Sequence, residues 1–147
     1  MRRHPVVVGP DATLFDALVL MRGQKVSGLP VVDEGGSLVG VLSQRDVARA
    51  LQGAGGGKKA SGPFDLLTFD FSETGAVNLP ALHQILEETS VRDAMSTPPI
   101  FIAPEASLEL AAEVMSENRI NRVPVLRGGR LVGIVTRNDL VRAIVHP

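Results

Sequence analysis

Two short polar motifs in this 147-residue chain are the strongest candidates for chemistry. Ser43-Gln44-Arg45-Asp46 and Thr136-Arg137-Asn138-Asp139 share one spacing, in which a hydroxyl is followed three residues later by a carboxylate. Each motif follows an apolar, β-branched run and precedes a helix-like stretch, which places it at a predicted helix N-terminus. There, the hydroxyl and the acid can form a capping box, and the helix dipole favours the acid.

The same geometry also suits a ligand. Free N–H groups at a helix N-terminus bind phosphate. A carboxylate beside them can accept hydrogen bonds from the two vicinal hydroxyls of a ribose, and each charge-assisted bond contributes about 1.5–3 kcal/mol. The residues alone leave both interpretations open, because one serine can cap a helix and touch a ligand.

The motifs occur twice because the chain itself is duplicated. Residues 5–51 and 99–144 follow one pattern, at an offset of 94 through Pro30 and Pro124 and of 93 after a one-residue gap. Each copy predicts a short strand, a helix, two strands joined by a Gly-rich turn, and a second helix. The predicted strands at the start of the two copies are Val6–Val8 and Ile100–Ile102. A duplicated β-α-β-β-α unit predicts two subdomains related by a pseudo-two-fold axis, with a cleft between them.

We expect residues 1–51 and 91–147 to form the two units, with 52–90 as a linker. The first unit has no counterpart of the lead-in at 91–94, so either the chain is part of something longer or this unit begins without it. Gly-rich residues 52–63 predict a flexible loop, whereas 64–71 is apolar but of mixed period. The spacing of Leu79, Leu82, Ile85 and Leu86 predicts a short helix, packed on its own domain or against a partner.

Composition argues against several classes of protein. The net charge of −1 and the pI of about 6.3 do not fit the basic face of a nucleic-acid binder, and no apolar run is long enough to span a bilayer. Cysteine is absent, which excludes disulfides and thiol catalysis and fits a cytoplasmic protein. The three histidines lack metal-ligand spacing, and the Gly-rich segment before Lys58 fails the phosphate-loop pattern at Gln52 and Lys59. We therefore expect no metal and no enzymatic activity.

Taken together, the repeated features resemble the CBS domain, which is named for cystathionine β-synthase. The resemblance rests on the Gly28-Leu29-Pro30 and Arg122-Val123-Pro124 steps, the Leu-Val-Gly runs and the terminal hydroxyl-x-x-Asp motifs. Two such units in tandem resemble a CBS pair, or Bateman module, over most of 1–51 and 91–146. The resemblance implies an α/β fold of the α+β type, with two CBS units packed about a pseudo-two-fold axis.

The resemblance also implies a function. Such modules require no cofactor and bind AMP, ADP, ATP or S-adenosylmethionine in clefts between the repeats. They commonly form homodimers, usually regulate an attached effector domain or a partner protein, and catalyse nothing themselves. With the composition, this predicts a module that binds no nucleic acid and does not insert into a membrane. Carried onto this chain, Asp46 and Asp139 would hold ribose hydroxyls, assisted by Ser43 and Thr136.

The remaining ligand contacts implied by the resemblance are apolar or cationic. Backbone and side chains near the first strands and the small-hydrophobic-Pro steps would line the adenine slots: Val6, Val8, Leu29, Pro30, Ile100, Ile102, Val123 and Pro124. Arg137 would meet phosphate. The resemblance also offers Arg45, Arg119 and Arg122 as phosphate contacts, but for these three we favour a solvated surface charge. The competing hypothesis is a structural or dimerisation module that takes no small-molecule ligand.

Overall fold

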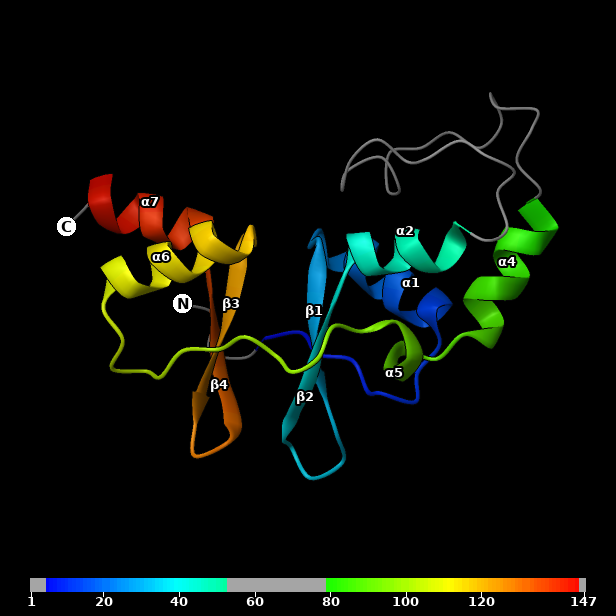
Figure 1. Ribbon diagram of the computed structural model, residues 1–147, viewed down its shortest axis with the longest axis horizontal. Coiled ribbons are helices and arrows are strands. Elements are labelled where there is room, and N and C mark those ends of the chain that lie inside the picture. Colours follow the sequence, from blue (N-terminus) through cyan, green and yellow to red (C-terminus); the bar gives the residue numbers. More distant parts are fainter. Residues whose placement is uncertain (1–4, 53–78, 146–147) are drawn as a thin grey trace.

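The computed structural model describes residues 5–52 and 79–145 (Figure 1). The predicted flexible loop beyond Gln52 and the apolar stretch at 64–71 lie outside these residues. The element order of the described part is helix, two strands and helix in each repeat, with two further helices between the repeats. Within these residues, no helix is both long enough and apolar enough to cross a membrane.

The first repeat contains α1 (Leu14–Gln24), β1 (Gly28–Val32), β2 (Leu38–Ser43) and α2 (Gln44–Leu51). The Thr13 hydroxyl accepts the Asp16 N–H at 3.1 Å and so caps α1. The helix ends at Lys25, which adopts the left-handed conformation with φ 55°. The hairpin β1–β2 pairs antiparallel, from Gly28 opposite Ser43 to Val32 opposite Leu38.

The second repeat contains α6 (Leu108–Asn118), β3 (Arg122–Arg127), β4 (Arg130–Thr136) and α7 (Arg137–Val145). Ser107 caps α6 by accepting the Leu110 N–H at 3.1 Å, and Arg119 ends it at φ 54°. Lys25 and Arg119 are equivalent positions of the repeat, so both copies end their first helix in the same way. The β-α-β-β-α prediction is therefore confirmed, with one change at its first strand.

That change concerns the segments predicted as strands at 6–8 and 100–102. Each contributes only an isolated parallel bridge, Val8 with Val31 and Ile102 with Val125. A proline follows two residues after each bridge, and proline cannot donate to a ladder. The bridges still lie at equivalent positions of the two repeats and hold each segment beside its hairpin.

The two hairpins are related by a pseudo-two-fold axis, as the duplication predicts. At one end Arg122 Nη1 donates to the Gly28 carbonyl oxygen at 3.0 Å, and Gly28 and Arg122 are equivalent residues. At the other end Ser37 bridges Arg130, which is also its equivalent. Equivalent residues can touch each other only where they approach the axis, so these pairs place the axis between the hairpins (Figure 1).

The helix layers of the two repeats differ because the two described helices between them pack on the core of the first repeat. Helix α4 (Leu79–Glu88) buries Leu82 and half-buries Ile85 and Leu86 against the core of the first repeat. Helix α5 (Val91–Ala94) adds Val91 to the same core. The stripe in the linker thus packs on its own chain. In Figure 1, α4 and α5 lie beside α1 and α2, away from α6 and α7.

Candidate functional site

Both hydroxyl-x-x-Asp motifs form reciprocal caps. The Asp46 N–H donates to Ser43 Oγ at 3.2 Å, and Asp46 Oδ2 accepts the Ser43 N–H at 2.9 Å. In the second repeat the Asp139 N–H donates to Thr136 Oγ1 at 3.2 Å, and Asp139 Oδ2 accepts the Thr136 N–H at 2.8 Å. The capping interpretation is therefore confirmed for both motifs, and it leaves a ligand contact possible.

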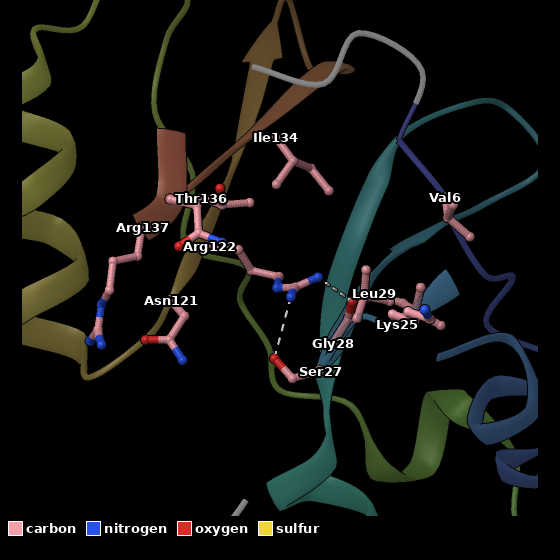
Figure 2. A pocket seen from close by; sticks show the side chains of 12 residues that line it. Val6, Lys25, Ser27, Gly28, Leu29, Asn121, Arg122, Ile134, Thr136 and Arg137 are labelled. Carbon is pink, nitrogen blue, oxygen red and sulfur yellow. Dashed lines mark hydrogen bonds between the residues drawn. The ribbon is translucent and has the colours of Figure 1, made fainter. Parts of the chain in front are cut away.

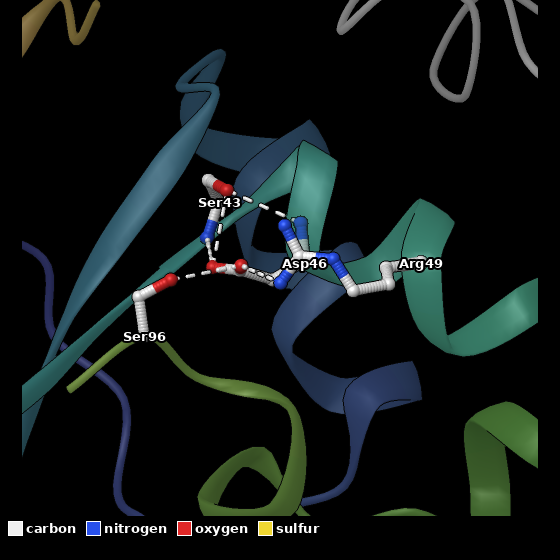
Figure 3. Close-up of polar contacts among 4 residues, drawn as sticks. All are labelled: Ser43, Asp46, Arg49 and Ser96. Carbon is white, nitrogen blue, oxygen red and sulfur yellow. Dashed lines mark hydrogen bonds and ion pairs between the residues drawn. The ribbon is translucent and has the colours of Figure 1, made fainter. Parts of the chain in front are cut away.

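The Asp46 carboxylate makes further contacts within the protein. Its side chain is buried, and Oδ1 accepts the Ser96 hydroxyl at 2.9 Å with Arg49 Nη1 at 3.6 Å (Figure 3). Ser96 is held in place because it exchanges backbone hydrogen bonds with Val41 at 3.1 and 2.9 Å. Both carboxylate oxygens of Asp46 are thus engaged. A ribose contact by Asp46 stays a prediction, and it would require Ser96 to release this bond.

A cleft of about 400 Å³ lies between the two repeats (Figure 2). Its volume falls in the range of small-molecule sites, roughly 300–1,000 Å³. Twelve residues from both repeats line it: Val6, Lys25, Val26, Ser27, Gly28, Leu29, Asn121, Arg122, Ile134, Thr136, Arg137 and Asn138. The walls are fixed by equivalent backbone bonds, from Gln44 N to Ser27 O at 3.1 Å and from Arg137 N to Asn121 O at 2.8 Å.

The charged side chains that line the cleft are all basic. Lys25, Arg122 and Arg137 line it, and none of the twelve lining residues is acidic. Arg122 is half-buried; its Nη1 donates to Gly28 O at 3.0 Å and its Nη2 to Ser27 Oγ at 3.3 Å. Burial lowers the pKa of Arg122 below its ordinary value, because desolvation disfavours the charged guanidinium. The cleft therefore offers positive charge to a ligand.

The cleft brings together four of the side chains expected from the sequence: Val6, Leu29, Thr136 and Arg137. Asp139 does not line it but holds the backbone of Thr136, which does. The other expected contacts lie elsewhere. Val8, Pro30, Ile102, Val123 and Pro124 are buried, Ile100 is exposed, and Ser43 and Asp46 cap α2. For these residues a ligand contact stays a prediction.

The expected surface position of Arg122 is wrong, because its guanidinium reaches across the cleft to the other repeat (Figure 2). Arg45 and Arg119 are exposed as expected and are not among the lining residues. The sequence interpretation missed six lining residues: Lys25, Val26, Ser27, Asn121, Ile134 and Asn138. The repeat offset could have found two of these, since it pairs Ser27 with Asn121 and Gly28 with Arg122. Arg122 contacts Gly28 near the axis, and all four residues line the cleft.

Comparison with known proteins identifies the repeats. The CBS domain model matches residues 1–53 and 91–146. The uncharacterised protein MJ1426 of Methanocaldococcus jannaschii is 33% identical over 147 residues, covering 97% of this chain and 88% of that protein. Chloroplastic CBSX2 of Arabidopsis thaliana is 34% identical over 99% of this chain, which spans only 60% of CBSX2.

Solved structures agree with this assignment. CBSX2 in complex with AMP matches with a TM-score of 0.68 and 32% identity, over 98% of this chain and 90% of that one. The CBS domain of a CBS-domain-containing membrane protein from Sphaerobacter thermophilus matches with a TM-score of 0.70 and 31% identity, over 95% and 82%. Since the family matches fall on the two repeats that flank the cleft, the chain belongs to the CBS domain family and contains a tandem CBS pair.

Proposed function

We propose that this chain is a regulatory module that binds an adenosine-type ligand in the cleft between its CBS repeats. The observation that carries the proposal is the cleft itself, which combines apolar wall residues, the hydroxyl of Thr136 and three cationic side chains. The complex of CBSX2 with AMP supports it, because that protein is 32% identical and shares the fold. Catalysis is no part of the proposal.

In the proposed complex the ribose lies at the N-terminus of α7. Ribose hydroxyls donate to the Asp139 carboxylate, which also accepts the Thr136 N–H. The base packs on Leu29, Val6 and Ile134, and these residues come from both repeats. A ligand that touches both repeats favours one angle between them, and it shifts that equilibrium only by its different affinity for the two states. An attached effector domain or a partner protein would respond to this shift.

The ligand proposal predicts a specific loss of affinity. We expect Asp139→Asn to weaken AMP binding by about tenfold or more, because hydrogen bonds to a charged carboxylate contribute about 1.5–3 kcal/mol. The measurement is isothermal calorimetry, supported by thermal shift. In the wild type, AMP at about a hundred times its dissociation constant should add about 2.7 kcal/mol of stability.

Asp16→Asn is the matched control, because Asp16 occupies the same first-turn position of α1 and is not among the residues that line the cleft. It should leave AMP affinity unchanged. Equal affinity in wild type and Asp139→Asn would argue against the ribose assignment. If calorimetry is silent for AMP, ADP, ATP and S-adenosylmethionine, the structural module becomes the better interpretation. Its own support is the capping role of both aspartates and the engagement of Asp46 by Ser96.

We also propose that two copies of the chain associate through α6 and α7. Leu51 and Ile144 are equivalent residues, yet Leu51 is 8% exposed and Ile144 is 77% exposed. Val141 and Val145 lie on the same face of α7 as Ile144 and are 52% and 61% exposed. An apolar face of this kind marks an interaction site.

Charge favours a second copy as the occupant of this face. Helix α6 carries Glu109, Glu113 and Glu117 with no basic residue, whereas α7 carries Arg137 and Arg142. A two-fold axis presents the same patch on both copies. It can therefore set α6 of one copy against α7 of the other and pair opposite charges twice.

Introducing charge at this face should disrupt the dimer. We expect Ile144→Asp to weaken dimerisation by at least about tenfold, because a carboxylate would be buried without a partner. Sedimentation velocity over a concentration series measures the change. Val19→Asp is the control, since Val19 is 58% exposed on α1 of the other repeat. A wild type that stays monomeric throughout the series would overturn this proposal and leave a helix of another protein as the occupant.

A further inference from the structure

We propose that Ser96 decides which of the two hydroxyl-x-x-Asp motifs takes the ligand. Its hydroxyl holds the place on the Asp46 carboxylate at which a ribose hydroxyl would donate. The first motif is therefore closed by the chain itself, and the ligand binds first at the second motif, which ends at Asp139. This inference rests on the proposed function and specifies the order in which the two equivalent motifs fill.

The first support is the set of contacts on the Asp46 carboxylate. Oδ2 accepts the Ser43 N–H at 2.9 Å and the Ser43 hydroxyl at 3.1 Å. Oδ1 accepts the Ser96 hydroxyl at 2.9 Å, and Asp46 is only 4% exposed (Figure 3). The Ser96 hydroxyl thus makes the same kind of charge-assisted bond that a ribose hydroxyl would make. A ligand at Asp46 has to replace this bond rather than add one.

The second support is the rigid position of Ser96. Its backbone exchanges hydrogen bonds with Val41 of β2 at 3.1 and 2.9 Å. Helix α5, just before it, is fixed to the same repeat because the Val91 N–H donates to the Ala12 carbonyl oxygen at 2.8 Å. A hydroxyl that is already held in place loses little further freedom when it binds, whereas a free ligand must be immobilised. Ser96 is therefore an effective competitor for Asp46.

The third support is the position of the two motifs relative to the cleft. The first three residues of the second motif, 136–138, line the cleft (Figure 2). The equivalent residues of the first motif, 43–45, are not among its lining residues. Gln44 is 2% exposed, whereas its equivalent Arg137 is exposed. A ligand that enters the cleft therefore meets the second motif, although both motifs have the same local pattern.

Ser96 also lies in the segment that joins the two repeats. Its backbone is bonded to Val41 of the first repeat, and Ile102, farther along the segment, donates its N–H to the Pro124 carbonyl oxygen of the second at 3.0 Å. A ligand that displaces Ser96 from Asp46 removes one of the bonds that hold this segment to the first repeat. Filling the second motif alone leaves that bond in place. The two occupancies would thus differ in their effect on the connection between the repeats.

The test counts AMP sites by isothermal calorimetry in the wild type and in Ser96→Ala. In the wild type we expect one site, with any second site at least about tenfold weaker, since a bond to a charged carboxylate must be given up there. Ser96→Ala should tighten the second site at least about tenfold and leave the first within about twofold. Ser90→Ala is the matched control, because Ser90 lies in the same segment and its side chain caps no helix. It should change neither site.

The outcomes separate this inference from the proposed function. Two equal sites in the wild type, or a second site that Ser96→Ala does not tighten, overturns the inference and leaves the adenosine site at Asp139 standing. No AMP binding by either protein overturns both. Adding Asp46→Asn to Ser96→Ala should remove the second site only, and its persistence contradicts the inference. If Ser96→Ala fails to fold by circular dichroism, Ser96→Cys takes its place, because a thiol donates only weakly, and it must tighten the second site in the same direction.

Discussion

Replacing Leu14 with alanine should lower the free energy of unfolding by about 3 kcal/mol, while the same change at Leu108 should cost less than about 1 kcal/mol. The two leucines are equivalent residues at the start of the first helix of each repeat. Leu14 is 0% exposed and Leu108 is 51% exposed. The difference arises because the core that contains Leu14 also receives Leu82 from α4 and Val91 from α5.

Urea denaturation followed by circular dichroism measures both changes. Both substitutions are made in the Ile144→Asp background, so that the proposed dimer contact does not cover Leu108. Equal losses at the two positions would contradict the asymmetric covering of the helix layers. A large loss at Leu108 only in the native background would show that association buries this residue.

Replacing Gly40 with alanine should destabilise the protein by about 2 kcal/mol, in the range typical of overpacking. An added Cβ would lie 2.6 Å from Met95 Sδ and 3.0 Å from the Ser96 carbonyl oxygen. Met95 can move, but the Ser96 backbone is bonded to Val41 and its hydroxyl to Asp46. The added methyl group therefore pushes the Met95–Ser96 segment away from β2, to which Ser96 is bonded.

Gly23→Ala provides the matched comparison for this substitution. Gly23 lies in α1, and an added Cβ there meets nothing within 4 Å. Alanine has the higher helix propensity, so the change should stabilise the protein by about 0.5 kcal/mol. Thermal and urea unfolding of the two variants should thus give shifts of opposite sign. A neutral Gly40→Ala would mean that the Met95–Ser96 segment can leave β2 at little cost.

The parts of the structure that the sequence determined are those made by neighbouring residues. Each helix cap joins a side chain to a residue three positions away. This holds for the N-caps Thr13 and Ser107 and for the capping boxes Ser43/Asp46 and Thr136/Asp139. Such contacts depend only on local backbone geometry, and a repeated pattern produces them twice. The duplication also predicted the pseudo-two-fold axis, since similar units pack in similar ways.

Only the tertiary structure decided which of the two copies of a repeated residue or surface is buried within the protein and which stays exposed to a ligand or partner. Ser96, fifty residues along the chain, binds the Asp46 carboxylate, and helix α4 covers the helix layer of the first repeat only. Arg122 became a cleft residue because its equivalent is Gly28 and the two meet near the axis. The physical reason is that these contacts join residues distant in sequence. Their formation depends on how the repeats and the linker pack, and a local pattern of residues does not encode that packing.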